Sequence, residues 1–278
     1  MTTPLRAGSF IVTLLGDIVA PRGGEVWMGD IITFCAPFGL SETLIRTAMS
    51  RLMAAGQVQG LRQGRRSYYA LTQAAQEEYA IAARVIYSQD DNRTWRFLCF
   101  PDGQAAAHVA AQQDPGLIAL SDMLALGPAR GDLPPQAVAM TAQAEGSPEC
   151  LKAMGAQFWP LAELAADYDG FLVFAGQLDS LSPLTAPDAL GLRVLLVHAF
   201  RRIALRDPRL PSTALPAAWA GHRAQAEFAR IYLNLSKTAD SHVAAQFASA
   251  SGPLPRSTPE TRARRASLEA IARRVTRA

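Results

Sequence analysis

Residues 41–71, SETLIRTAMSRLMAAGQVQGLRQGRRSYYAL, hold the pattern that decides the fold of the N-terminal part of the chain. Ser41 precedes an amphipathic stretch that ends at Gly56, as is typical of a helix with serine at its N-cap and glycine after its last turn. Two short stretches follow, 58–62 and 67–71, with Gln63-Gly64-Arg65-Arg66 between them, and the second alternates as a half-buried strand does. The sequence therefore predicts a helix followed by a β-hairpin with a basic tip.

The predicted helix has two distinct faces. Its apolar face consists of residues at helical spacing: Leu44, Ile45, Ala48, Met49 and Leu52. Its opposite face is polar and consists of Thr43, Arg46, Thr47 and Ser50, with Glu42 and Arg51 beside it. A helix fits the major groove of DNA, where hydroxyl and guanidinium groups can bond to base edges and phosphates. This polar face is therefore a candidate for reading a duplex.

Apolar residues upstream predict two more helices. From Phe10 to Ile18 they recur four apart, and Pro21-Arg22-Gly23-Gly24 ends this first helix. A short apolar run over 31–36 leads to Pro37-Phe38-Gly39-Leu40, a tight turn of the kind that joins two helices at a steep angle. With one further helix predicted after the hairpin, the order of elements is typical of a winged helix-turn-helix.

The predicted contacts with DNA come from the polar helix face and the hairpin. Their residues are Ser41, Glu42, Thr43, Arg46, Thr47, Ser50, Arg51, Arg65, Arg66 and Tyr68. Arginine is the side chain best shaped for guanine, and the arginines of the tip suit phosphates or an adjacent minor groove. Taken singly, the helix could be an ordinary solvated one and the arginine pair a solvated loop. Their order and spacing together favour double-stranded DNA as the partner.

Charge is distributed unevenly along the 278 residues, although the net charge is only +3. Residues 1–88 hold 8 Lys and Arg against 6 Asp and Glu, residues 89–180 hold 4 against 12, and residues 181–278 hold 15 against 6. The basic C-terminal third predicts a polyanionic partner. The acidic middle argues against a protein that coats nucleic acid along its whole length.

The composition also limits the class of protein. With 49% hydrophobic and 18% charged residues the chain can bury real cores, and its length predicts two or three domains. Cys35, Cys99 and Cys150 are too far apart for a disulfide framework or a CxxC site, which indicates a reducing, cytoplasmic location. No stretch reaches the ~20 apolar residues of a membrane span, and the first residues are not typical of a signal peptide, so we expect no membrane partner.

Several stretches resemble one known family. In the N-terminal third they are SFIVTLLGD (9–17), PRGGEVW (21–27), APFGLSE (36–42), IRTAMSRL (45–52) and GRRSYY (64–69). In the C-terminal third they are LLVHAFRRIALRDPRLP (195–211), LPAAW (215–219), GHR (221–223) and Ile231-Tyr232. In order and distance they resemble the PaaX-type repressors of phenylacetic acid degradation. The resemblance implies a GntR-like winged helix, a central ferredoxin-like domain, a helical C-terminal domain, dimerisation and an aryl-acetyl-CoA thioester as inducer.

We therefore expect a multidomain α+β protein with three consecutive domains. These are a winged helix-turn-helix over 1–88, a small ferredoxin-like α+β domain over 89–180, and a helical domain with a basic tail over 181–278. The homodimer contact is expected beyond residue 89, because the N-terminal helices are expected to bury their apolar faces in a core of their own.

Polar residues of the C-terminal third supply the ligand candidates. His198, Arg201 and Arg202 lie on the polar side of a helix predicted over 189–205. They form either a solvated, salt-bridged face or a cradle for the phosphates of a CoA nucleotide, since arginine binds phosphate with paired donors. The seven arginines of 256–278 belong either to a tail that contacts DNA phosphate or to a docked surface helix. The apolar stripe of such a helix would consist of Leu268, Ile271, Ala272 and Val275.

An enzyme is the alternative class of protein. The sequence has no HExxH, GxSxG, GxxxxGK[ST] or GxGxxG motif, and its four histidines show no metal-ligand spacing. We therefore expect no catalytic residue, no metal and no cofactor. The one enzymatic candidate is Asp102, which follows a predicted strand and, paired across a dimer, could hold a metal for a nuclease reaction. Its alternative interpretation is a turn residue in Pro101-Asp102-Gly103.

Overall fold

A computed structural model describes residues 5–88, 94–181 and 183–275 of the chain. The chain divides into two compact units, neither of which is continuous in sequence. Unit 1 comprises residues 1–88, 173–201 and 225–278, and unit 2 comprises residues 89–172 and 202–224. Helices and small sheets occur in both units, so the expected multidomain α+β class is confirmed.

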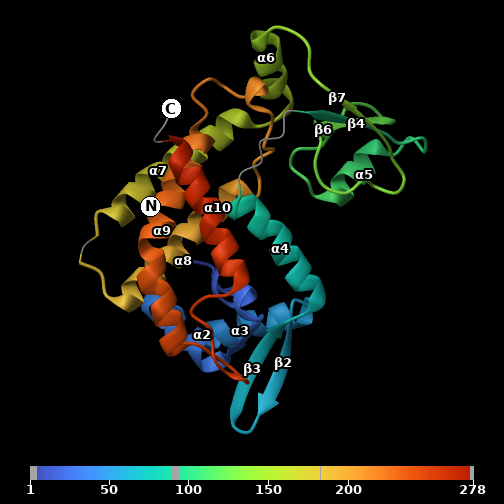
Figure 1. Cartoon of the computed structure of the whole chain (residues 1–278). Helices are drawn as coiled ribbons and strands as arrows, with labels where there is room; N and C mark the ends of the chain where they lie inside the picture. Colours follow the sequence, from blue (N-terminus) through green and yellow to red (C-terminus); the bar gives the residue numbers. More distant parts are fainter. Residues whose placement is uncertain (1–4, 89–93, 182, 276–278) are drawn as a thin grey trace. The chain divides into compact units, whose positions relative to one another are not determined.

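Unit 1 begins with the predicted winged helix (Figure 1). Its elements are α1 (Ala7–Leu14), the π-helical segment η1 (Leu15–Val19), the 3-10 turn η2 (Ala20–Arg22), β1 (Glu25–Trp27), α2 (Met28–Cys35), the 3-10 turn η3 (Ala36–Phe38), α3 (Glu42–Ala54), β2 (Val58–Gln63), β3 (Arg66–Leu71) and α4 (Gln73–Tyr87). The strands form an antiparallel sheet in the order β1-β3-β2. The sequence does not predict β1, because three residues are too few to show the alternation of a strand.

Local signals explain where α3 and the hairpin begin and end. The Ser41 hydroxyl accepts a hydrogen bond from the Leu44 amide at 3.3 Å, which satisfies one of the free donors of the first helical turn. Gly56 after α3 and Gly64 in the hairpin turn have φ values of +69° and +60°. Glycine adopts this left-handed backbone without the steric cost of a side chain, so both chain reversals follow from local chemistry.

The C-terminal helices complete unit 1. The remaining elements of the C-terminal half are α7 (Leu161–Asp179), α8 (Ala186–Ala204), the 3-10 turn η4 (Ser212–Ala214), α9 (Ala220–Gln246), β8 (Ala248–Ser249), β9 (Gly252–Pro253) and α10 (Pro259–Val275). α7, α8 and α9 each run from one unit into the other. In the part of the chain that the structure describes, none of the helices is long and apolar enough to cross a membrane.

The core of unit 1 joins the two ends of the sequence. Buried side chains of α1, α2 and α3 share one cluster with residues of the C-terminal third, namely Leu190, Val194, Ala239, Val243, Phe247 and Leu254. The observed units therefore differ from three consecutive domains over 1–88, 89–180 and 181–278, and only the division after residue 88 coincides with an observed one. The expectation that the N-terminal helices form a core of their own is wrong. Periodicity shows that a helix face is apolar, but not which distant segment covers it.

Unit 2 contains a small antiparallel sheet. Its described elements before α7 are β4 (Trp95–Cys99), α5 (Ala105–Gln112), β5 (Ile118–Ala119), β6 (Leu124–Pro128), β7 (Val138–Ala142) and α6 (Pro148–Phe158). The strand order β5-β6-β4-β7 is that of a ferredoxin-like sheet. A βαββαβ unit has a second helix before its last strand, but residues 129–137 connect β6 to β7 as a loop. Gly131, Pro134 and Pro135 interrupt this stretch, which corrects the expected domain to a sheet of that order without the second crossover helix.

Candidate nucleic-acid interface

Helix α3 is held by one face and presents the other to solvent. Ile45, Ala48 and Met49 are buried in the core of unit 1. The predicted contact residues at this helix are all exposed: Ser41, Glu42, Thr43, Arg46, Thr47, Ser50 and Arg51. Leu44, which the sequence places on the apolar face, is 53% exposed beside them. The exposed surface of α3 is therefore mainly polar with two large apolar side chains, Leu44 and Met53, of which periodicity assigns Leu44 to the core.

The polar side chains of α3 bond to one another rather than to other elements. Arg46 Nε and Nη2 lie 2.8 and 2.7 Å from Glu42 Oε1, and the Thr47 hydroxyl donates to the Thr43 carbonyl oxygen at 2.8 Å. An exposed pair four residues apart on a helix contributes only about 0.3–0.5 kcal/mol. Arg46 can therefore exchange Glu42 for another partner at low cost.

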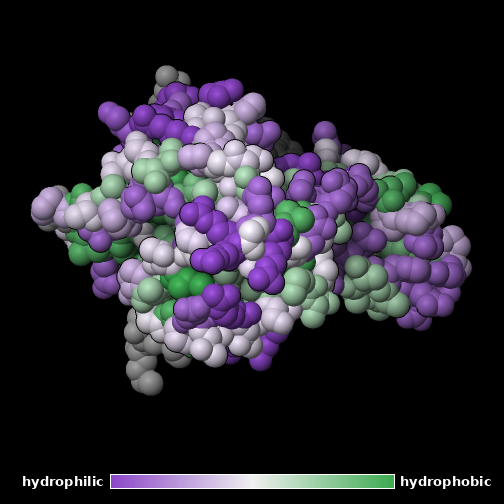
Figure 2. Space-filling view, turned by 90° about the horizontal axis from the view of Figure 1, so that it is seen from below, coloured by the Kyte–Doolittle hydropathy of each residue, from purple (hydrophilic) through white to green (hydrophobic). Residues whose placement is uncertain are grey.

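The hairpin β2–β3 carries cations at its end. Gly64 and Arg65 form a two-residue turn, and the positive φ of Gly64 suits the first position of a type II′ turn. Arg62, Arg65 and Arg66 are exposed, and the guanidinium carbon of Arg66 lies 4.7 Å from the centre of the Trp27 ring. Figure 2 views the protein from below and shows hydrophilic residues gathered over the hairpin end of unit 1. Arg62 adds a cation that the sequence pattern did not single out.

Tyr68 does not belong to this surface. It is only 5% exposed and lies opposite Trp27 of β1 and Leu61 of β2 in the sheet register. The predicted DNA contact of Tyr68 is therefore wrong, because its side chain is buried in the middle strand of the three-stranded sheet. Alternation alone puts Tyr68 on the same face of β3 as Arg66, so the burial of Tyr68 cannot be predicted from the strand itself.

Two of the three predicted ligand residues attach α8 to α1. The His198 Nδ1 atom is buried and lies 2.8 Å from the Thr13 hydroxyl oxygen. Arg201 donates to the same Thr13 oxygen at 2.8 Å and to the Ser9 carbonyl oxygen at 3.2 Å. Arg202 is exposed. His198 and Arg201 therefore already bond to α1 inside unit 1, which leaves Arg202 as the one exposed residue of the predicted phosphate cradle.

A buried charge network, which no sequence pattern reveals, joins the ends of unit 1. The Asp17 side chain is fully buried, and its Oδ2 accepts a hydrogen bond from Arg193 Nε at 3.1 Å. Its Oδ1 accepts from Arg264 Nη1 at 2.9 Å and from the hydroxyls of Tyr87 and Tyr232 at 2.9 and 2.8 Å. Burial alone would raise the pKa of Asp17, but the two arginines and two tyrosines outweigh burial and hold the pKa below its usual value.

The same network docks the basic C-terminal helix. Besides its bond to Asp17, Arg264 lies over the Tyr87 ring, with 3.8 Å between the guanidinium carbon and the ring centre. Leu268 and Ile271 are buried, as the predicted apolar stripe requires. The side chain of Val275, the last member of the stripe, lies outside the described residues. The docked helix is therefore the arrangement observed for residues 259–275.

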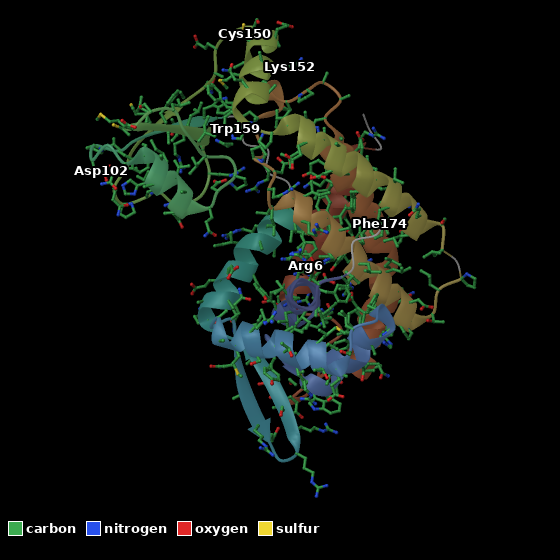
Figure 3. The ribbon with its side chains drawn as sticks, turned by 180° about the vertical axis from the view of Figure 1, so that it is seen from behind. Arg6, Asp102, Cys150, Lys152, Trp159 and Phe174 are labelled. Carbon is green, nitrogen blue, oxygen red and sulfur yellow. The ribbon has the colours of Figure 1, made fainter. Side chains whose placement is uncertain are left out.

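Asp102 lies in the turn before α5 (Figure 3). Its Oδ1 accepts from the Gln104 amide at 3.0 Å, and its Oδ2 lies 2.6 Å from His108 Nε2. The hydrogen bonds from His108 and the Gln104 amide hold the pKa of Asp102 below its usual value. No group of three or more His, Cys, Asp or Glu able to hold a metal occurs among the residues that the structure describes. The bond from Asp102 to the amide two residues on is that of an Asx turn.

Family models match two stretches of the chain, the first in unit 1 and the second spanning parts of both units. The PaaX-like protein model matches residues 6–75, and the model of the PaaX-like protein C-terminal domain matches residues 159–245. The chain belongs to the PaaX-like protein family. The two matched stretches of this PaaX-like chain contain α3, the hairpin and the helices that complete the shared core.

Two relatives extend the likeness along the chain. The transcriptional repressor PaaX of Escherichia coli (strain K12) is 29% identical over 276 residues, covering 91% of this PaaX-like chain and 87% of that protein. The structure of an uncharacterized protein from Mycobacterium tuberculosis is similar in fold, with a TM-score of 0.50 and 19% identity, and covers 86% of this chain and 99% of that one. The similarity to the Escherichia coli repressor therefore extends over unit 2 as well as the winged helix.

Proposed function

We propose that this PaaX-like protein is a transcriptional repressor that binds duplex DNA through α3 and the β2–β3 hairpin. The observation that carries the proposal is the exposed polar face of a helix whose opposite face is anchored in the core. Such a helix suits the major groove, and the cations of a projecting hairpin suit neighbouring phosphates. The similar Escherichia coli protein is a transcriptional repressor, which supports the same role here.

The exposed side chains divide by the contacts they can make. Arg46 can release Glu42 and donate two hydrogen bonds to a guanine. Leu44 offers an apolar contact for the methyl group of a thymine. Arg62, Arg65 and Arg66 suit phosphates, which set affinity and register without reading sequence. We therefore assign base recognition to α3 and backbone binding to the hairpin.

The repressor is proposed to act as a homodimer that an aryl-acyl-CoA releases from an operator of aromatic-acid catabolism. Two protomers are needed because one winged helix covers one half of a symmetric site. Release requires the effector to favour the state that binds DNA poorly. The family resemblance supports this class of effector, and a cavity in unit 1 supports a place for its acyl end.

This cavity has a volume of about 810 Å³ and lies between η2, α4 and α10. Its lining is largely apolar and includes Ala20, Pro21, Tyr79, Ala80, Ala83 and Ala263. The volume lies within the ~300–1,000 Å³ of small-molecule sites. The Tyr79 hydroxyl is buried and has no hydrogen-bond partner among the described residues, so a thioester carbonyl would supply an acceptor. Because α4 directly follows strand β3, an acyl group here is placed to act on the hairpin.

The test begins with selection of duplexes from a random library by the full-length protein. We expect a symmetric motif to be enriched, and fluorescence anisotropy to show weaker binding of that duplex when phenylacetyl-CoA is added. Free phenylacetate should have no effect. The variant Ala83→Phe, which fills the cavity, should bind the duplex normally but lose the response. If no sequence is enriched, the repressor function is contradicted. If a sequence is enriched but phenylacetyl-CoA does not weaken its binding, only the proposed effector is contradicted.

A further inference from the structure

A second cavity of unit 1, of about 520 Å³, is lined mainly by cations. Its basic side chains come from three segments: Arg22 from η2, Lys237 from α9, and Arg256, Arg262 and Arg265 from α10 and the residues just before it. Among the described residues that line it, Asp240 is the one acid. We call this cavity, defined by these six side chains, the α9–α10 pocket.

Asp240 does not neutralise the positive charge at the rim of the pocket, because it is already in ion pairs with buried arginines. Its Oδ1 accepts from Arg22 Nη2 at 2.7 Å and from Arg193 Nη1 at 2.7 Å. The side chains of both arginines are 1% exposed. A second nitrogen of Arg193, Nη2, is buried and has no hydrogen-bond partner in the described part of the chain. Asp240 is therefore already paired with buried arginines and is not available to balance the cations at the rim of the pocket.

Three of the four cations at the rim are in no ion pair within the described part of the chain. Arg265 pairs with Glu269 at 3.0 Å. Lys237, Arg256 and Arg262 are exposed and have no carboxylate within ion-pair distance among the described residues. Burial lowers the pKa of Arg22, and the nearby Arg193 lowers it further, as expected where like charges crowd together. An anion in the pocket would relieve this repulsion.

We infer that the α9–α10 pocket binds a diphosphate-bearing small molecule. Three rim cations without partners match the charge of a diphosphate, and guanidinium groups bind phosphate oxygens with paired donors. Ser257, just before α10, and Thr261, in its first turn, also line the pocket and add hydroxyl groups. The cations converge from three segments on one hollow, which suits a compact diphosphate better than a row of DNA phosphates.

The phosphate chemistry has two possible sources. One is the diphosphate of a nucleotide, including that of a CoA thioester, in which case the inference rests on the proposed function. The other is the DNA backbone, since both offer the same phosphate oxygens. The expected source is the small molecule, and the experiment below separates the two.

Isothermal titration calorimetry of the full-length protein with inorganic pyrophosphate and with ADP tests the site. We expect the wild type to bind both, and Arg262→Ala and Lys237→Ala each to weaken binding about tenfold, as loss of a charged hydrogen bond predicts. Arg273→Ala is the matched control, because Arg273 is exposed on the same helix but does not line the pocket. Equal melting temperatures of the variants would show that each is folded.

The outcomes separate this inference from the proposed function. If the wild type selects a duplex but binds neither pyrophosphate nor ADP, this inference is overturned and the repressor function stands. Equal weakening by Arg273→Ala would also overturn it, because general attraction would then explain the binding. If Arg262→Ala lowers the affinity for ADP but leaves the affinity for the duplex unchanged, the phosphate that binds in the pocket is that of the small molecule. If Arg262→Ala lowers both affinities and ADP competes with the duplex, the phosphates that bind in the pocket are those of DNA, and the small-molecule assignment is wrong.

Discussion

Helices α3 and α8 look alike in sequence and differ in what covers them. Each has an apolar face and a face with arginine and other polar side chains. The polar side chains of α3 are exposed and bond within the helix, as Arg46 does with Glu42. On α8, Arg193 is buried against Asp17 of η1, 176 residues away, and Arg201 is part-buried against Thr13 of α1, 188 residues away. A polar helix face is thus available to a ligand only where no other segment supplies its partners.

The largest difference between the two helices should appear in stability. Asp17→Ala leaves Arg193 and Arg264 buried without their carboxylate, so we expect it to lower the free energy of unfolding by about 3–5 kcal/mol. Urea denaturation of the full-length protein measures this loss. The control is Arg46→Ala on α3, which should change the same free energy by less than about 0.5 kcal/mol. Similar losses for the two variants would contradict the comparison.

The buried carboxylate should also make the protein sensitive to acid. The pKa of Asp17 in the folded state lies below the value of 3.8 typical of an unfolded chain. Its stabilising contribution is therefore complete above pH ~4 and is lost as the pH falls through the folded pKa. Urea denaturation between about pH 2 and 5 should show a shallower loss for Asp17→Asn than for the wild type. Identical pH profiles of the two proteins would mean that Asp17 does not contribute to the loss of stability in acid.

Arg201 tests whether the polar side of α8 serves packing or ligand binding. Arg201→Ala removes hydrogen bonds to Thr13 and Ser9, so we expect the free energy of unfolding to fall by about 1–3 kcal/mol. Affinity of the folded variant for phenylacetyl-CoA should stay unchanged in calorimetry. Full stability combined with lost ligand affinity would instead support the phosphate cradle.

Arg46 tests the exposed face in the opposite way. We expect Arg46→Ala to leave the melting temperature unchanged and to weaken binding of a selected duplex by about 1–3 kcal/mol, because a bidentate base contact is lost. Binding of a random duplex should change much less. An equal loss on both duplexes in an anisotropy titration would assign Arg46 to phosphate instead of a base.

The smallest effect is expected at the hairpin tip. Arg65→Ala should weaken binding to every duplex alike and reduce the slope of log affinity against log salt by about 1, since one phosphate contact is lost. Titrations at several salt concentrations measure this slope. A change in sequence preference would show that the hairpin also reads bases.

The local part of the DNA-binding surface could be predicted from the sequence alone. Serine before α3, glycine after it and glycine in the hairpin turn are short-range signals, and helical spacing separates Ile45 and Met49 from Arg46 and Thr47. The predictions failed where the outcome depended on a distant segment. Tyr68 is buried in a sheet whose strand β1 the sequence does not predict, and His198 and Arg201 of α8 already bond to Thr13 of α1.

By itself, then, the sequence determined which residues form α3 and the hairpin, because caps, turns and helical spacing act within a few residues. It left the basic C-terminal segment open between a tail and a docked helix. Only the tertiary structure decided that both ends of the chain share one core, that Asp17 is surrounded by arginines and tyrosines, and that cations from three segments line one pocket. Those features join side chains 70 to 247 residues apart. Contacts at such separations leave no period in the sequence, because each residue's partner is selected by the packing of whole helices rather than by its neighbours in the chain.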